Sequence, residues 1–581
     1  MLTTPRRVDR RSRREKRSRT ASVLLILLFL LCSDEPVPSA SRDPVRARKG
    51  MVVSADELAS RVGVEILKKG GNAVDAAVGV GFALAVVYPQ AGNIGGGGFM
   101  VIRFSDGRTT SIDFREKAPA GARHDMYLDE HDNVRGKESL YGHLACGVPG
   151  SVAGLLYALE TYGTMDRDDV LDPAIKLAKK GFRIHYRLSG ALKNAIEHFR
   201  PFPGSMRVFT KNGEPYQEDE VLVQKDLAKT LSKIRKHGVD GFYRGEIADL
   251  IVKEMERGGG LITYADLAAY SPVERNTVVG SYRGFEIISM GPPSSGGVLL
   301  VQLLNIVEGY DLWGYGLLSS KSVHVMAEAM KRVYADRAEY LGDSDFVDIP
   351  IEWLISKEYA ALRRSQIDTM RATPGDEVHH GEPLASEIKE TAHFSVVDKE
   401  GNVVSMSTTL NSWFGSKVVV QGAGFFLNSE MDDFSAKPDF PNVEGLIGRQ
   451  ANAIRPHKRM LSSMTPTIVA KDGRPFMVVG SPGGSKIITS VFQVIVNVID
   501  FGLDIQEAND APRFHHQWLP DTLYCEANGF PRDVIENLTV MGHTVAEESV
   551  QGGVEAILID RARGWILGAT DSRGYGAAVG Y

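Results

Sequence analysis

The sequence predicts an α+β fold in which stacked antiparallel sheets lie between layers of helices. Two segments are typical of β-hairpins, because strand-forming residues flank turn residues: TAHFSVV-DKEG-NVVSMSTTL begins at Thr391, and TPTIVA-KDGR-PFMVVGS begins at Thr465. A helix from Ile487 to about Phe501 is expected after the second hairpin. A further strand pair, with its turn at SDGR, follows the glycine-rich GNIGGGGFMVIRF. Helical segments flank these strands, which favours sheets covered by helices on their outer faces.

Helical periodicity is strongest in the first two thirds of the chain. SADELASRVGVEILKKGG predicts a helix, with Ser54 and Glu57 as a capping box. Asn72 is expected to cap a second helix, from Ala73 to about Val87, which is apolar on nearly every face and is therefore predicted to be buried. MAEAMKRVYADRAEYLGD predicts an amphipathic helix.

The first 41 residues differ in composition from the rest. Nine Lys or Arg residues in the first twenty are followed by the apolar run VLLILLFLL and the small-residue stretch PSAS. This order predicts an export signal over residues 1–41, because the apolar run is too short to cross a hydrocarbon layer of about 30 Å as a helix. We expect an exported protein, periplasmic or extracellular, with no membrane span after the signal is removed. A signal anchor, or a lipid on Cys32, is the alternative.

Charge and cysteine content narrow the function classes. The formal net charge is −6 and no basic patch stands out, so nucleic-acid binding is not expected. Beyond residue 41 only Cys146 and Cys525 remain, too few for a disulfide scaffold, and we expect two buried thiols, with a disulfide between them as the alternative. No spacing of Cys, His or acidic residues resembles a metal site. The GGGG segment lacks the lysine of a phosphate-binding loop.

A polar, breaker-rich tract, residues 371–390, runs directly into the strand that opens at Thr391. We expect this tract to be an exposed, mobile connection. A threonine hydroxyl is a poor nucleophile without an adjacent base, and its own α-amine, with a pKa of about 8, serves as one once the bond between Glu390 and Thr391 is cut. Taken alone, β-propensity explains a threonine at this position equally well.

Several longer segments carry a family resemblance. The chain resembles γ-glutamyltranspeptidases over about residues 50–581, and the matching segments follow one another in the family's order. They are PQAGNIGGGGFM, DFREKAP, STTLNSWFGS, NSEMDDFS, KRMLSSMTPTIV and GSPGGSKI. The resemblance implies the four-layered αββα sandwich of N-terminal-nucleophile hydrolases and no cofactor. It also implies that the precursor cuts itself between Glu390 and Thr391. The products are a large subunit (42–390) and a small subunit (391–581) intertwined in one domain.

The resemblance assigns roles to individual residues. Thr391 is implied as the nucleophile, Thr409 as the group that hydrogen-bonds its hydroxyl, and Gly483 and Gly484 as backbone donors to the oxyanion. For the substrate's α-carboxylate the implied ligands are Arg115, Ser462 and Ser463, and for its α-ammonium they are Asn411, Glu430 and Asp433. Without the resemblance, an arginine between two acids indicates a structural ion pair, and two glycines before a helix indicate a turn.

The implied function is that of a self-processing γ-glutamyltransferase and glutathione hydrolase. Its substrates are glutathione and other γ-glutamyl compounds, and water, an amino acid or a peptide accepts the glutamyl group. The alternatives are a glutaryl-type β-lactam acylase, a poly-γ-glutamate depolymerase and a non-catalytic exported binding protein on the same fold. KPDFPNVEGLIGRQANAI resembles the family's lid loop, and Glu444 stands where some relatives have an aromatic gate residue, which leaves the acceptor preference open.

Overall fold

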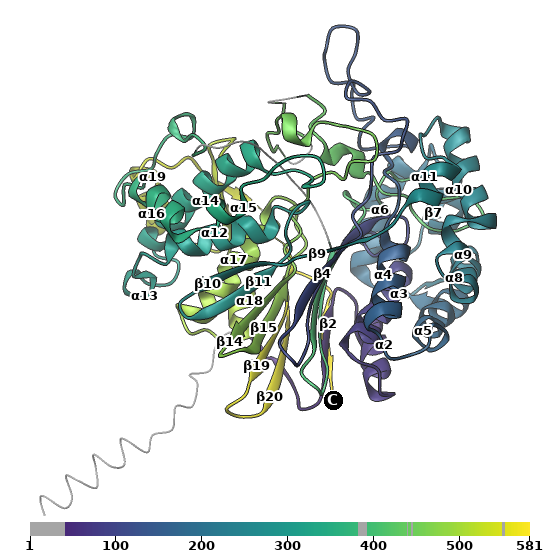
Figure 1. The fold of residues 1–581 in the computed structure, drawn as a ribbon, viewed down its shortest axis with the longest axis horizontal. Coiled ribbons are helices and arrows are strands. Elements are labelled where there is room, and N and C mark those ends of the chain that lie inside the picture. The colour runs from purple at the N-terminus through teal and green to yellow at the C-terminus, as the bar shows by residue number, and fades with distance from the viewer. Residues whose placement is uncertain (1–40, 382–391, 438–439, 443–444, 549–551) are drawn as a thin grey trace, which may run out of the picture. The chain divides into compact units, whose positions relative to one another are not determined.

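Two seven-stranded antiparallel sheets lie face to face between two layers of helices (Figure 1). The computed structural model describes residues 41–381, 392–437, 440–442, 445–548 and 552–581. The predicted α+β sandwich, with stacked antiparallel sheets between helical layers, is confirmed.

Each sheet combines strands from distant parts of the chain. The first sheet has the order β21 (Ala577–Gly580), β2 (Met51–Ser54), β12 (Ala392–Val397), β13 (Val403–Thr409), β3 (Gly97–Arg103), β4 (Thr109–Asp113) and β9 (Val273–Arg275). The second has the order β1 (Val45–Ala47), β20 (Trp565–Thr570), β19 (Glu555–Asp560), β15 (Arg474–Gly480), β14 (Thr467–Lys471), β11 (Phe285–Ser289) and β10 (Val278–Tyr282). The hairpins β12–β13, β14–β15 and β3–β4 match the predicted turns.

The alternation of side chains along the strands builds three apolar cores. In β13, Val404 and Met406 face the first helical layer, whereas Val403 faces the other sheet. In β15, Met477 and Val479 face the second helical layer in the same way. Because successive strand residues point to opposite faces, strands buried on both sides are apolar at nearly every position.

The two helical layers come from different parts of the sequence. The first layer consists of α2 (Glu57–Lys68), α3 (Ala73–Val87), α4 (Ser151–Tyr162), α5 (Arg167–Lys180), α6 (Tyr186–Phe199), α7 (Pro203–Phe209), α8 (Lys225–His237), α9 (Asp240–Tyr243), α10 (Gly245–Gly258) and α11 (Tyr264–Ala269). The second consists of α12 (Gly296–Val307), α13 (Leu312–Tyr315), α14 (Ser320–Tyr340), α15 (Ile351–Leu354), α16 (Lys357–Ser365), α17 (Lys486–Ile499), α18 (Ile505–Asp510) and α19 (Arg532–Val540). A small sheet, β16 (Phe514–His515), β17 (Leu523–Glu526) and β18 (Val545–Glu548), lies after α18 in the chain.

Two predicted details of the helices are wrong. The α2 cap is Asp56, which accepts a hydrogen bond from Leu58 N, because Ser54 is the last residue of β2. The predicted amphipathic helix, α14, is buried at every position from Ser322 to Tyr340. Its charged side chains form ion pairs inside the protein instead of facing water. The buried helix α3, capped by Asn72, is confirmed.

Residues 371–381 are not the loose connection that their composition predicts. Ala372 N donates to Met541 O at 2.7 Å, and Lys331 Nζ donates to Thr373 O at 2.6 Å. Gly375 N donates to Asp521 Oδ2 at 2.7 Å, and Gly381 N donates to an α14 carboxylate at 3.0 Å. The chain that leads toward residue 390 is therefore held against α14 up to Gly381, and residues 382–390 lie outside the described part.

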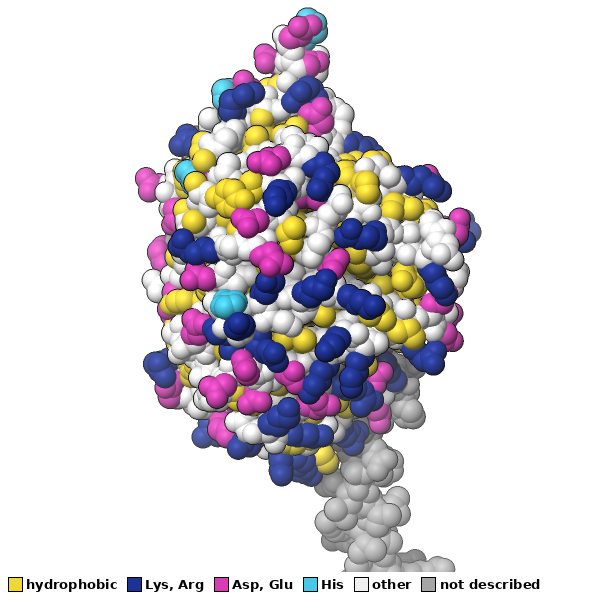
Figure 2. Space-filling view, turned by 90° about the vertical axis from the view of Figure 1, so that its right-hand side faces the viewer, with side chains coloured by type: hydrophobic (Ala, Val, Ile, Leu, Met, Phe, Trp, Pro, Cys, Tyr) yellow, Lys and Arg dark blue, Asp and Glu magenta, His cyan; other side chains and the backbone are white. Residues whose placement is uncertain are grey.

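The surface charges are mixed and the two cysteines are buried, as the composition predicts. On the face formed by the first helical layer, Lys and Arg side chains are interspersed with Asp and Glu (Figure 2). The absence of nucleic-acid binding stays a prediction. Cys146 and Cys525 are both buried free thiols, as expected. No helix among the described residues is both long enough and apolar enough to cross a membrane.

Candidate active site

Arg115 lies at the centre of a buried polar cluster just after β4. Its side chain is fully buried; Nη1 lies 2.7 Å from Glu430 Oε2, and Nη2 lies 2.5 Å from Asp433 Oδ2. Nε and Nη2 also donate to the carbonyls of Met460 and Leu461, both at 3.2 Å. The guanidinium therefore joins the 430–433 turn to the 460–463 segment, and the family resemblance implied that both belong to one site.

Three carboxylates surround this single cation. Glu116 Oε2 lies 3.4 Å from Arg115 Nη1, and Glu116, Glu430 and Asp433 all have fully buried side chains. Burial raises the pKa of Glu430 to about 7 and that of Glu116 to about 8, although the arginine opposes both shifts. Burial lowers the pKa of Arg115, but Glu430 and Asp433 together outweigh it and raise that pKa. The cluster thus has three carboxyl groups for one guanidinium, and a second cation beside them would favour their ionised forms.

Thr409, the last residue of β13, contacts the same cluster. Its Oγ1 donates to Glu430 Oε1 at 2.8 Å and accepts from Asn411 N at 2.8 Å. Asn411 takes a positive φ of 68° and donates its Nδ2 to Ser429 O at 2.9 Å. The predicted residues Thr409, Asn411 and Glu430 are therefore in direct contact.

The predicted nucleophile precedes the first described residue of β12. Ala392 pairs with Thr408, so β12 begins beside the end of β13 that carries Thr409. Glu390 and Thr391 lie outside the described residues, and their role stays a prediction.

Asn93, which was not predicted as a site residue, hydrogen-bonds to the backbone of Thr409. Its Nδ2 donates to Thr409 O at 2.7 Å and to Thr408 Oγ1 at 3.0 Å, and its Oδ1 accepts from Gly96 N at 2.9 Å. A Cβ at Gly96 would collide with Thr409 O, and one at Gly98 would collide with a β13 carbonyl. The GGGG segment thus allows close approach of β3 to β13. Its sequence signal was a polar residue two positions before the four glycines.

Ser462 and Ser463 follow the carbonyls that hold Arg115. Ser463 Oγ accepts from Arg337 Nη2 at 2.8 Å, while Ser462 Oγ accepts from Met464 N at 3.1 Å. Both side chains are fully buried. Arg337 is a second buried arginine of this region that the sequence did not reveal, because it lies on α14, far away in the chain.

Gly483 and Gly484 lie in the connection from β15 to α17. Their φ angles are 132° and 63°, in the region that favours glycine. Neither N–H group donates a hydrogen bond within the described part of the chain. Tyr334 Oη donates to the carbonyl of Ser485, the next residue, and the Arg337 guanidinium lies 5.9 Å from the Tyr334 ring. This chain of contacts connects the glycines to Ser463, but not directly to Thr409.

Among the described residues no group of three or more His, Cys, Asp or Glu side chains could hold a metal ion. The lid segment is described only in part, and Glu444 lies outside the described residues. Asn452, near its end, donates Nδ2 to Asp433 O at 2.6 Å and accepts from Leu461 N at 3.1 Å, so the end of the segment contacts the cluster.

Comparisons with known proteins agree with this geometry. The family model described as Gamma-glutamyltranspeptidase matches residues 59–581. The glutathione hydrolase proenzyme of Escherichia coli (strain K12) is 52% identical over 531 residues, which is 91% of each chain. A solved cephalosporin acylase from Bacillus halodurans has a TM-score of 0.83 at 28% identity, covering 94% of this chain and 98% of that one. A solved Helicobacter pylori gamma-glutamyltranspeptidase has a TM-score of 0.57 at 48% identity, covering 59% of this chain and 97% of that one.

The stacked sheets between helical layers define a fold of the N-terminal-nucleophile hydrolase type. The matched family model covers nearly the whole of the sandwich, and with it every predicted site residue. The chain belongs to the gamma-glutamyltranspeptidase family.

Proposed function

We propose that the chain cuts itself between Glu390 and Thr391 and then acts as a γ-glutamyltransferase and glutathione hydrolase. The observation that carries this proposal is the buried cluster of Arg115, Glu430 and Asp433 in contact with Thr409. One cation and several carboxylates within a few ångströms of each other suit the head of an α-amino acid, which has one charge of each sign. The family membership of the chain supports the same function.

When the substrate binds, its charged head replaces the ion pairs that Arg115 forms with Glu430 and Asp433. Its α-carboxylate binds Arg115 and the hydroxyls of Ser462 and Ser463. Its α-ammonium binds Glu430 and Asp433. Each Arg115–carboxylate ion pair is then replaced by a pair between protein and substrate, so no buried charge loses its partner. Uncharged or singly charged heads leave one side of the cluster unpaired and bind less well.

The chemistry requires one hydroxyl and one amine. Thr391 Oγ attacks the γ-carbonyl carbon of the substrate, and the free α-amine of Thr391 takes the hydroxyl proton. The tetrahedral oxyanion accepts hydrogen bonds from the N–H groups of Gly483 and Gly484. Neither group has another acceptor in the described part of the chain. The C–N bond breaks, the leaving amine takes the proton, and a glutamyl ester remains on Thr391. Water, an amino acid or a peptide amine then attacks this ester.

A glutaryl-type acylase is the second candidate, because an acylase is among the structural relatives. Glutaryl groups have no α-ammonium, so Glu430, Asp433 and the excess acid of the cluster would face no positive charge. The composition of the cluster therefore favours γ-glutamyl substrates. The basic and apolar composition of residues 1–41 supports export, and we propose that the activity lies in the periplasm or outside the cell.

The test compares the wild-type chain with Thr391→Ala and Thr391→Ser on a denaturing gel, with N-terminal sequencing of the smaller band. We expect the wild-type chain to give pieces that end at 390 and begin at 391, and Thr391→Ala to remain one folded, inactive chain. Serine keeps the oxygen and is expected to restore both processing and hydrolysis of a γ-glutamyl anilide in part. Processing of the alanine variant at the normal rate would rule out this proposal.

A further inference from the structure

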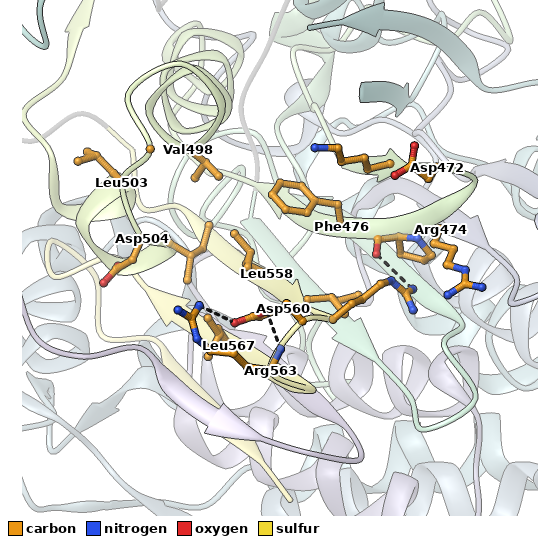
Figure 3. A pocket seen from close by; sticks show the side chains of 17 residues that line it. Asp472, Arg474, Phe476, Val498, Leu503, Asp504, Leu558, Asp560, Arg563 and Leu567 are labelled. Carbon is orange, nitrogen blue, oxygen red and sulfur yellow. Dashed lines mark hydrogen bonds and ion pairs between the residues drawn. The ribbon is translucent and has the colours of Figure 1, made fainter. Parts of the chain in front are cut away.

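A cavity of about 740 Å³ opens at the end of the second sheet that is remote from the candidate active site (Figure 3). It lies between the β14–β15 turn, the β19–β20 turn and the connection from α17 to α18. Its lining consists of residues 471, 472, 474–476, 498, 502–505, 558–563 and 567. Cavities of this size accept small organic ligands.

One side of the cavity is apolar. Phe476 of β15 and Leu558 of β19 form the strand side and lie near the centre of Figure 3, while Val498 and Leu503 form the helical side and lie to their left. Phe476, Leu503 and Leu558 are each only partly buried, packed against the edge of the second helical core. An apolar surface that stays open to solvent next to a core attracts an aliphatic or aromatic tail.

The cavity is lined by more arginines than have an ion-pair partner in the described part of the chain. Within the described part of the chain neither Arg474 nor Arg561 has an ion-pair partner, and Arg561 Nη2 donates only to the Pro475 carbonyl, at 3.4 Å. Burial, together with the charges of Arg474 and Arg103, lowers the pKa of Arg561. Arg563, in contrast, is paired with Asp560 at 3.2 Å.

The acids of the lining do not balance these arginines. Asp560 is already paired, and Asp504 caps α18 by accepting from the N–H groups of Gln506 and Glu507. Asp472 is exposed on the β14–β15 turn.

Behind this turn, Arg103 is 4% exposed and donates Nη2 to Gly473 O at 2.8 Å. Its Nε has no hydrogen-bond partner among the described residues, and Arg103 forms no ion pair there. A buried guanidinium without a counter-ion is costly, so this end of the sheet favours an anion.

We infer that this cavity binds an amphipathic anion, a medium-chain alkyl carboxylate, with its head on Arg474 and Arg561 and its tail against Phe476, Leu503 and Leu558. The site is separate from the proposed catalytic site. β15 leads from Arg474 at the cavity to Gly480, three residues before Gly483, and its six residue steps span roughly 20 Å at the rise of a strand.

The test is a calorimetric titration of the full chain with decanoate, below its micelle concentration. Acetate supplies the head without the tail, and decanol supplies the tail without the charge. We expect saturable binding of decanoate, at least tenfold weaker binding of both analogues, and at least tenfold weaker binding of decanoate by Arg474→Gln/Arg561→Gln. Arg532→Gln, which removes an exposed arginine on α19, is the matched control and should bind like the wild-type chain.

Hydrolysis of a γ-glutamyl anilide, measured in parallel, shows that each variant is folded and should be unchanged. The single variant Arg474→Gln, at an exposed position, replaces the double variant if the latter does not fold. The inference is overturned if decanoate shows no saturable binding, if acetate or decanol binds as tightly, or if the charge-removing variants bind like the Arg532→Gln control. None of these outcomes depends on whether the chain processes itself.

Discussion

Replacing Glu430 with glutamine tests the electrostatics of the Arg115 cluster with a minimal change of shape. Glutamine keeps an oxygen that accepts from Thr409 Oγ1, the contact that Glu430 makes at 2.8 Å. It removes the negative charge that lies 2.7 Å from Arg115 Nη1 and that the proposal assigns to the substrate's α-ammonium. Asp433 still pairs with the arginine, so we expect the variant to fold.

The size of the effect follows from the raised pKa of Glu430. With a pKa of about 7, this carboxyl is ionised to roughly 90% at pH 8 and roughly 10% at pH 6. If the ammonium binds the ionised form, the wild-type KM rises about tenfold between these pH values. The glutamine variant lacks this titration, and its KM should change less than about threefold. At pH 8 its KM should be about fivefold higher, because a hydrogen bond to a charged group is about 1 kcal/mol stronger than one to a neutral group.

The assay is the initial rate of γ-glutamyl anilide hydrolysis over a range of substrate concentrations from pH 5.5 to pH 8.5. Glu116→Gln is the matched control: it removes another buried acid of the cluster, and the rise of KM below pH 7 should persist in it. A KM of Glu430→Gln that rises tenfold toward acid pH, as in the wild-type chain, would refute the assignment of the ammonium contact to Glu430.

Two further predictions follow from buried charges and buried histidines. Arg115→Lys keeps the charge but loses the planar fork, and we expect KM for a γ-glutamyl anilide to rise by a factor corresponding to about 1–3 kcal/mol; an unchanged KM would remove Arg115 from the site. His324 donates Nε2–H to Asp368 O at 2.7 Å and accepts at Nδ1 from His543 Nε2 at 2.8 Å, so both rings are neutral in the fold. Burial lowers the pKa of His543 to about 3, so its contribution to stability is complete above pH 6.5 and is lost as the pH falls toward 3. We expect His543→Gln to reduce the loss of unfolding free energy between pH 6.5 and pH 5 by about 2 kcal/mol, measured by urea unfolding of the uncut Thr391→Ala chain; an equal loss in both proteins would contradict this assignment.

Local signals predicted the strands and the buried helix α3, because turn residues and side-chain periodicity act over a few residues. The cap of α2 was misassigned, since Ser54 and Asp56 both suit the position and strand pairing of Ser54 decides between them. The order in residues 371–381 was invisible to composition, because its hydrogen-bond partners lie on α14 and after residue 520.

For the candidate active site, the motifs identified the main charged residues but not all of their neighbours. Motifs identified Arg115, Glu430 and Asp433 as one group, and the structure brings them into contact. The third carboxylate, Glu116, was read only as a neighbour of the arginine, although it belongs to the same cluster. Its contribution depends on complete burial, which no local pattern reveals. The orientation of Asn93 toward Thr409 likewise depends on the packing of β3 against β13.

The strand order of the two sheets has a consequence for a chain cut before Thr391. In the first sheet β12 and β13 lie between β2 and β3, and in the second β14 pairs with β11 while β20 pairs with β1. The two pieces cannot separate without breaking both sheets, so dissociation and unfolding become a single event. Refolding of the uncut precursor is first order, whereas reassembly of the cut pieces requires an encounter and depends on concentration. Such a cut would thus turn a fold that one chain can re-form by itself into a fold whose lifetime is set by its unfolding rate.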